Sequence, residues 1–335
     1  MIPNHLLIYN FMIITRTPYR VSLFGGGTDH PLWFNKNHGA VLSLTIDKFS
    51  YINVRILPPF FEHNFRVAYS KVETTILASE IKHPAVREAF IKYAPGLHLE
   101  LHHHGDLPSR SGVGSSSAFS VGIIHSLLAL NGEIVSSIEL ARKAIEFEQE
   151  ILNENVGFQD QIACALGGVN FISFGPDNVW SAELLDLSSE YIADIESRMI
   201  LIYSGIERLS SDITQSLLTN LDSKSHLMQR NQQLAKDAKE IFKNEGDLSQ
   251  IGPMLMENWR LKWSANPAAA TPELQVLYSE GIRAGASGGK VLGAGGGGFM
   301  LFWVNPENKI DFAKKMSKHT IIPIRISRVG SVRVI

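Results

Sequence analysis

Residues 106–118 read Asp-Leu-Pro-Ser-Arg-Ser-Gly-Val-Gly-Ser-Ser-Ser-Ala, and an apolar run follows them as far as Asn131-Gly132. Two glycines frame a short loop, and the apolar run has the spacing of a buried helix face that ends at Asn131-Gly132. Free backbone N–H groups and the positive end of the helix dipole favour an anion at such a helix N-terminus. Glycines let the backbone approach a phosphate, and the serines add donors or a magnesium ligand. A serine N-cap that binds nothing explains the same stretch equally well.

Composition favours a globular chain that does not bind nucleic acid. The 335 residues suggest two domains, and 44% hydrophobic with 19% charged residues is typical of a protein with a substantial core. The net charge is −2, from 31 Lys and Arg against 33 Asp and Glu, so no basic stripe indicates a nucleic-acid partner.

Three further observations predict a cytoplasmic protein without a membrane partner. The single cysteine, Cys164, cannot form an internal disulfide and fits a reducing compartment. Residues 1–12 lack the basic region and small-residue cleavage site of a secretory signal. No apolar run approaches the roughly 20 residues of a membrane span.

A carboxylate interrupts the apolar face of the next expected helix, residues 137–152. Glu148 falls in the middle of an arc formed by Leu140, Ala144, Ile151 and their apolar neighbours. A buried carboxylate is costly unless a cation or hydrogen-bond donors meet it. Both a buried salt bridge and a metal ligand satisfy that condition.

A second glycine-rich stretch covers residues 285–298 and contains the spacing G-x-G-x-x-G at Gly293, Gly295 and Gly298. The dinucleotide-binding fingerprint requires a strand before these glycines and a helix after them, whereas here a strand is expected to follow. Neither glycine stretch spells the P-loop pattern G-x-x-x-x-G-K-[ST].

The remaining periodicity predicts a mixture of strands and helices. Strands are expected at residues 13–24, 40–46, 50–57, 97–101, 169–174, 199–203, 299–304 and 321–326. Helices are expected at residues 83–93, 162–166, 211–221, 225–244, 248–264, 273–284 and 311–317. A polar stretch at about 188–197 suggests a domain junction, which divides the chain into residues 1–190 and 191–335.

Phosphoryl transfer explains an anion-binding loop, a misplaced carboxylate and a second glycine loop together. That chemistry needs a cradle for phosphates, a magnesium ion and a carboxylate that orients or deprotonates the acceptor hydroxyl. Asp160, on a polar stretch that we expect to be a loop, is the natural acceptor-side carboxylate.

The chain resembles the GHMP-type small-molecule kinases, the superfamily of galactokinase, homoserine kinase and mevalonate kinase. Three family motifs are matched in order, at residues 18–29, 108–118 and 290–298. The resemblance implies an α+β fold: a ribosomal-protein-S5 domain-2-like N-terminal domain (residues 1–190) and a ferredoxin-like C-terminal domain (residues 191–335). ATP and the substrate would lie between the two domains.

The resemblance also implies roles for individual residues. Asp160 would be the catalytic base or an electrostatic anchor, paired with Arg20. Magnesium would bind Glu148 and a serine among Ser115 to Ser117, for which Ser116 is our choice. ATP binding is assigned to Pro108, Ser111, Gly112, Val113, Gly114, Ser115, Ser116 and Ser117. Substrate binding is assigned to Gly26, Gly27, Thr28, Asp29, Arg110, Gly295 and Gly296.

Departures from the galactokinase pattern narrow the expected substrate. Galactokinases carry Glu-His-Thr-Asp where this chain has Gly-Gly-Thr-Asp at residues 26–29. The three motifs are most similar to the branch that phosphorylates the anomeric O1 of D-glycero-D-manno-heptose 7-phosphate, on the route to GDP-heptose for surface polysaccharide. Fucokinases or other sugar 1-kinases are the alternative, followed by a non-catalytic sugar sensor. The expected partners are a sugar phosphate and ATP, with a homodimer left open.

A substrate that already carries a phosphate needs cations away from its O1. The candidates from the sequence are Arg110, Arg260, Lys262 and Arg283.

Overall fold

The computed structural model describes residues 12–206 and 224–335, and its larger β-sheet is built on two long antiparallel strands, β1 (Met12–Phe24) and β2 (Gly39–Ile56). The prediction of two separate strands in place of β2 was wrong. The polar pair Asp47-Lys48 resembles a turn, but the strand continues through it, with a register shift opposite residues 18–20 of β1. The backbone N–H of Asp47 donates to the carbonyl of Arg325, so the segment keeps its hydrogen bonds.

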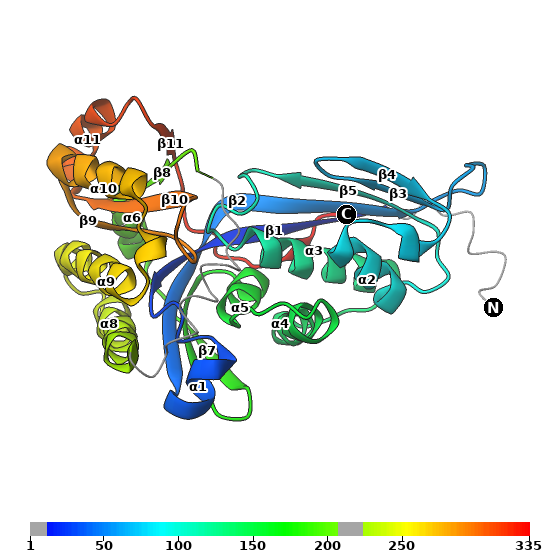
Figure 1. Cartoon of the computed structure of the whole chain (residues 1–335), viewed down its shortest axis with the longest axis horizontal. Helices are drawn as coiled ribbons and strands as arrows, with labels where there is room; N and C mark the ends of the chain where they lie inside the picture. The colour runs from blue at the N-terminus through cyan, green and yellow to red at the C-terminus, as the bar shows by residue number, and fades with distance from the viewer. Residues whose placement is uncertain (1–11, 207–223) are drawn as a thin grey trace.

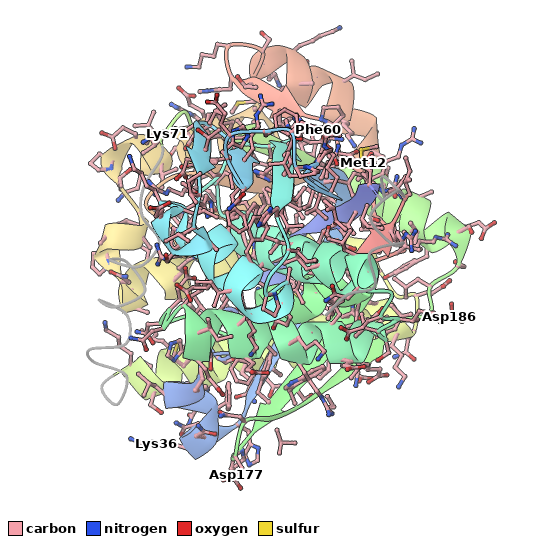
Figure 2. All side chains as sticks on the ribbon, turned by 90° about the vertical axis from the view of Figure 1, so that its right-hand side faces the viewer. Met12, Lys36, Phe60, Lys71, Asp177 and Asp186 are labelled. Carbon is pink, nitrogen blue, oxygen red and sulfur yellow. The ribbon has the colours of Figure 1, made fainter. Side chains whose placement is uncertain are left out.

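The long strand β2 has different partners along its two halves, which gives the sheet the bend seen in Figure 1. The first half pairs with β6 (Val169–Gly175), followed by β7 (Val179–Leu184). The second half pairs with β5 (Leu99–Gly105), followed by β3 (Phe65–Ala68) and β4 (Val72–Thr75). In Figure 2 the labelled Phe60 and Lys71 mark the β3–β4 end of this sheet, and Asp177 marks the β6–β7 turn.

Four helices cover one face of this sheet (Figure 1). They are α2 (Pro84–Tyr93), α3 (Ser115–Leu130), α4 (Ser137–Glu146) and α5 (Gln159–Leu166). The central helix α3 packs on both β1 and β2 and buries apolar side chains such as Val121, Ile124 and Leu127. This burial fixes the N-terminal end of α3, and so the loop before it, relative to the sheet. A short helix, α1 (Pro31–Asn37), lies beside β6.

The second sheet has four antiparallel strands in the order β11 (Thr320–Ile322), β8 (Met199–Tyr203), β10 (Phe299–Val304) and β9 (Ala286–Val291). Strand β11 is shorter than expected, since Pro323 has no N–H to continue the ladder. The helices around this sheet are α6 (Ser189–Arg198), α8 (Ser225–Lys243), α9 (Ile251–Ala265), α10 (Pro272–Ala284) and α11 (Lys309–Lys315). Short 3-10 turns occupy Ala78–Glu80, Leu248–Gln250, Pro267–Ala269 and Pro306–Asn308. The helix expected at residues 211–221 lies outside the described residues.

After β11 the chain returns to the first sheet, where β12 (Val332–Arg333) pairs with β1. One apolar core runs from the first sheet to Leu201 and Trp303 of the second, and a smaller core lies on the other face of that sheet. The polar stretch expected to be a junction forms α6. The division at residue 190 therefore stays a prediction. Among the described helices, none is long and apolar enough to cross a membrane.

Candidate active site

A pocket of about 660 Å³ lies where elements of the two sheets meet. The N-terminal half lines it with β1, the turn after β1, the loop before α3 and the start of α5. The C-terminal half lines it with α8, α9 and the loop between β9 and β10. All three motifs singled out in the sequence therefore converge on one cavity.

The loop before α3 has the geometry expected of an anion cradle. Gly114 is the N-cap of α3 with φ of 72°, and Gly112 has φ of 82°, conformations that favour glycine. The first N–H groups of α3 point out of the helix end, as at every helix N-terminus. The backbone N–H of Arg110 donates to Ser115 Oγ at 3.2 Å, which ties the loop to the first turn.

The residues expected to bind ATP divide into two groups. Gly112, Gly114, Ser115, Ser116 and Ser117 line the pocket, whereas Pro108, Ser111 and Val113 do not. Ser111 Oγ donates to the Pro108 carbonyl at 2.6 Å, and the Val113 carbonyl accepts from Arg20 N–H at 2.9 Å. These three residues therefore stabilise the loop on the side that faces away from the pocket.

Arg20 and Asp160 form a two-point ion pair beside this loop. Arg20 Nε donates to Asp160 Oδ1 at 2.6 Å and Nη2 donates to Oδ2 at 2.6 Å, while Nη1 donates to the Gly112 carbonyl at 2.6 Å. Asp160 lies in the first turn of α5, so the prediction that it lies on a loop was wrong. The helix starts three residues early because the apolar Phe158 is buried at its N-cap and holds that turn against the core.

Glu148 is buried, with 1% of its surface exposed, in a π-helical turn (Phe147–Ile151, η2) that continues α4. Its Oε2 accepts hydrogen bonds from Ser117 Oγ at 3.0 Å and from Gln161, whereas the buried Oε1 has no partner among the described residues. Burial raises the pKa of Glu148 to about 8, although the hydrogen bonds from Ser117 and Gln161 oppose that rise. The described cations do not pair with this carboxylate, so it is not part of a buried salt bridge there.

This donor set fits a magnesium ion shared with nucleotide phosphates. The unpaired Oε1 and the Ser117 hydroxyl supply the hard oxygen ligands that magnesium prefers. Within the described residues no three His, Cys, Asp or Glu side chains gather around a metal position, so a magnesium ion held here would need phosphates and water as its other ligands. Ser116 is exposed, and the serine that contacts Glu148 is Ser117. The geometry therefore favours Ser117 over Ser116.

The turn after β1 is held by hydrogen bonds on both of its sides. Asp29 Oδ1 accepts from the Gly27 N–H at 2.8 Å and Oδ2 from the Gln159 N–H at 3.3 Å. Burial and the nearby Asp160 raise the pKa of Asp29. Gly26, Gly27 and Asp29 line the pocket, whereas Thr28 is fully buried and donates to the Gly25 carbonyl, so its expected sugar contact is not supported.

Asn231 of α8 is a site residue that the sequence reasoning missed. Its Oδ1 accepts from the Gly25 N–H at 3.0 Å and its Nδ2 donates to the Gly26 carbonyl at 2.9 Å. It shares a helix face with the buried Met228 and Ala235. A polar residue on an apolar helix face was the available signal, the same signal that identified Glu148.

The loop between β9 and β10 packs directly on the loop before α3. A Cβ atom at Gly293 would lie 2.6 Å from Gly112 Cα, and one at Gly298 would lie 2.3 Å from the Ser111 carbonyl oxygen. Gly295 lines the pocket, while Gly296 donates its N–H to the Ala269 carbonyl at 2.9 Å and does not line it. Contact of Gly295 or Gly296 with the substrate stays a prediction.

Of the four cations expected to bind a distal phosphate, two line the pocket and two do not. Arg110 and Lys262 line the pocket. Arg260 and Arg283 are exposed and do not line it, so they are not supported. Lys290, which lies within the third motif, lines the pocket as well and was not among the candidates.

Comparison with known proteins identifies the family. Residues 77–168 match the GHMP kinases N terminal domain and residues 222–321 match the GHMP kinases C terminal domain. A D-glycero-alpha-D-manno-heptose 7-phosphate kinase of Campylobacter jejuni is 30% identical over 91% of this chain and 93% of its own length. A bifunctional fucokinase/GDP-fucose pyrophosphorylase of Arabidopsis thaliana is 24% identical over 92% of this chain but only 31% of its own length.

Solved structures support the same assignment. A putative sugar kinase from Campylobacter jejuni superimposes with a TM-score of 0.76 at 27% identity, covering 97% of this chain and 99% of that one. A D-glycero-D-manno-heptose 1-phosphate kinase from Bacteroides thetaiotaomicron superimposes with a TM-score of 0.77 at 22% identity, covering 95% and 97%, which shows the shared fold. The chain belongs to the GHMP kinase family and is an ATP-dependent phosphotransferase that acts on sugars.

Proposed function

We propose that this kinase transfers the γ-phosphoryl group of ATP to the anomeric O1 of D-glycero-D-manno-heptose 7-phosphate. The similarity to the heptose 7-phosphate kinase of Campylobacter jejuni, over nearly the whole of both chains, supports the substrate. One geometric observation carries the chemistry. A Cβ atom at Gly114 would lie 3.4 Å from Asp160 Oδ2, so the carboxylate stands at the N-terminus of α3, where phosphates bind.

The proposed reaction uses Asp160 as the proton acceptor. Arg20 donates one hydrogen bond to each of its oxygens and Gln159 donates a second one to Oδ1, so Oδ2 keeps a lone pair for the substrate hydroxyl. The acceptor oxygen forms a bond to the γ-phosphorus as the bond from that phosphorus to the ADP oxygen breaks, and Asp160 receives the proton. The two hydrogen bonds from Arg20 fix the orientation of the Asp160 carboxylate.

The remaining pocket residues hold the reactants. Backbone N–H groups of the loop from Gly112 to Ser117 bind the ATP phosphates, and Glu148 with Ser117 would hold magnesium, which neutralises phosphate charge when bound. The turn that contains Gly26, Gly27 and Asp29 meets the sugar hydroxyls. Because Asp29 is held by two backbone N–H groups, its carboxylate is already in place before the sugar binds.

An ADP-release assay across a panel of sugars tests the substrate. The panel contains D-glycero-D-manno-heptose with and without a 7-phosphate, L-fucose, galactose and mannose. We expect kcat/KM for heptose 7-phosphate to exceed that for free heptose by a factor of about 10², because the unphosphorylated sugar leaves a buried cation unpaired. The product should carry an acid-labile anomeric phosphate. Equal efficiency on both heptoses would contradict the proposed substrate, and a preference for free fucose would replace it with a fucokinase activity.

A further inference from the structure

Two lysines of the C-terminal half enter the pocket beside Arg20. Lys262 is on α9 and Lys290 is on β9, two elements that pack against each other. Lys290 is 4% exposed, and its Nζ donates to the carbonyl of Leu23 on β1 at 2.9 Å. Lys262 Nζ donates to the carbonyls of Val291, at 3.3 Å, and Gly293. Both ammonium groups are thus fixed by backbone carbonyls at the wall of the cavity.

Neither ammonium group forms an ion pair within residues 12–206 and 224–335. Their described hydrogen-bond partners are neutral carbonyl oxygens. An ammonium group has three donors, so Lys290 retains two and Lys262 retains one for a further acceptor. A buried cation with only carbonyl partners is costly for the folded protein unless an anion arrives.

The two lysines and Arg20 repel one another. Desolvation lowers the pKa of Lys262 to about 7, with a further contribution from Arg20. Desolvation, Lys262 and Arg20 together lower the pKa of Lys290. The carboxylates that line the same pocket are Asp29, Glu148, Glu154 and Asp160, of which Asp160 is already paired with Arg20. This corner of the pocket therefore holds two amine groups that have no carboxylate partner among the described residues and that would be fully charged only with an anion beside them.

The position of the cluster relates it to the reacting groups. Lys262 donates to the carbonyl of Gly293, and Gly293 packs on Gly112 of the loop at residues 112–117, which we call the phosphate loop because we propose that it binds the ATP phosphates. The Gly112 carbonyl in turn accepts from Arg20, which holds Asp160. Lys262 is therefore connected through Gly293 to Gly112, and through Gly112 and Arg20 to Asp160.

We propose that Lys262 and Lys290, beside Arg20, form a binding site for a phosphate group of the reactants. A phosphate monoester dianion satisfies the free donors and balances the charge. Two sources provide such a group. The γ-phosphate of ATP follows from the family activity, whereas the sugar's own phosphate rests on the proposed function.

Binding titrations with paired probes test the site and separate the sources. The probes are orthophosphate, the magnesium complexes of AMPPNP and ADP, and heptose 7-phosphate against free heptose. Lys262→Met and Lys290→Met should weaken orthophosphate binding by about tenfold or more, the loss expected for a charge-assisted hydrogen bond. A matching loss for AMPPNP but not ADP identifies the γ-phosphate, and a loss for heptose 7-phosphate but not free heptose identifies the sugar phosphate. Arg260→Met, an exposed cation on the same helix, is the matched control and should leave all affinities unchanged.

Proton uptake gives a readout that a purely structural lysine would not produce. At pH 8, binding of orthophosphate to the wild type should take up protons, because the anion restores the charge of Lys262. Calorimetry in two buffers of different ionisation enthalpy measures this uptake. Lys262→Arg should retain most of the affinity and take up fewer protons, since a guanidinium is charged at every accessible pH.

The outcomes distinguish this site from the proposed substrate. Lys262→Met and Lys290→Met enzymes that bind orthophosphate, AMPPNP and heptose 7-phosphate as the wild type does would overturn the phosphate site. A wild type that fails to bind heptose 7-phosphate would instead overturn the proposed substrate. In that case the orthophosphate and AMPPNP titrations still decide whether the two lysines bind phosphate.

Discussion

At the scale of single residues, Asp160 is the proposed acceptor for the proton of the attacking hydroxyl. Asp160→Asn keeps the size of the side chain but removes its basicity and one of its two bonds to Arg20. We expect kcat to fall by a factor of about 10² or more, as for a positioned general base, and the melting temperature to fall as well, because the buried Arg20 loses its charged partner. Steady-state kinetics with saturating ATP and sugar measure the effect. Asp186→Asn, an exposed carboxylate labelled in Figure 2, is the control, and near-normal turnover in Asp160→Asn would remove this residue from the mechanism.

The ionisation of Glu148 should make the free energy of unfolding depend on pH. Its folded-state pKa of about 8 lies above the ordinary value of 4.5, so the neutral acid favours folding. That contribution is fully present below pH 4.5 and is lost as the pH rises to about 8. Glu148→Gln cannot ionise, so the ligand-free variant should match the wild type at pH 5. At pH 8 it should exceed the wild type by an unfolding free energy on the order of a few kcal/mol.

Magnesium should reverse this advantage. With a magnesium–nucleotide complex, the wild type should gain more thermal stability than Glu148→Gln, and the variant should need more magnesium for half-maximal activity. Melting temperatures between pH 5 and 8, with and without the nucleotide complex, check both statements. Identical pH profiles and identical magnesium titrations for the two proteins would return Glu148 to a structural role.

Some of these residues could be predicted from the sequence because a charged or polar side chain stands where the helical pattern calls for an apolar one. Glu148 interrupts an apolar helix face, and that conflict was visible without a structure. The choice among Ser115, Ser116 and Ser117 was not visible, because it depends on the orientation of α3 against η2. Asn231 also interrupts an apolar face, but its partner is the backbone of a turn about 200 residues earlier, which no local pattern indicates.

At the scale of elements, the loop between β9 and β10 supports the phosphate loop, and two glycines allow a controlled test. Gly298 has φ of 80° and its added Cβ would meet the Ser111 carbonyl oxygen at 2.3 Å. Gly132 has φ of 81° and nothing within 4 Å. Gly132→Ala should lose about 1 kcal/mol of stability through backbone strain alone, with normal kinetics. Gly298→Ala should lose more and should raise the ATP KM, because the phosphate loop must move.

Unfolding by denaturant and steady-state kinetics on both alanine variants measure these effects. A Gly298→Ala enzyme with a normal ATP KM and a raised sugar KM would contradict the assignment of this loop to the nucleotide side. A Gly132→Ala enzyme with altered kinetics would show that strain far from the pocket changes the site, so the comparison would lose its control.

Helices and strands with a clear pattern of apolar residues could be predicted from the sequence. Those whose extent depends on pairing with distant segments could not. Strands β8 and β10 occupy the predicted residues because continuous apolar runs suit a buried strand. The single strand β2 was divided in the prediction because Asp47-Lys48 is polar, and its continuity depends on pairing with β1 and with the chain near Arg325. Local propensity carries no information about such partners.

At the scale of the whole molecule, the return of the chain to the first sheet was not foreseen. The final strand β12 pairs with β1, and Ser331 Oγ lies 2.8 Å from Thr17 Oγ1. The two sheets are therefore joined by the segments near residues 199 and 323 and by the core that continues between them. A two-residue strand is too short to leave a periodic signal, so this return could not be predicted from the sequence.

Contact between the two halves also reaches the turn after β1, through α8. Asn231 holds the backbone of Gly25 and Gly26 with two hydrogen bonds, and Asn258 of α9 donates to Asn231 Oδ1. The C-terminal helices therefore fix the turn that we propose meets the sugar. Loss of both bonds in Asn231→Ala should cost about 1 to 2 kcal/mol of positioning energy, so the sugar KM should rise about tenfold while the ATP KM stays unchanged.

Steady-state kinetics with each substrate varied in turn measure this split for Asn231→Ala. Gln233→Ala removes an exposed amide of similar size from the same helix and should leave both constants as in the wild type. An equal rise in the ATP KM and the sugar KM would contradict the prediction, because α8 would then act on the whole pocket rather than on the turn. A rise in the sugar KM alone would support the proposal that α8, in the C-terminal half, positions the turn after β1 in the N-terminal half for sugar binding.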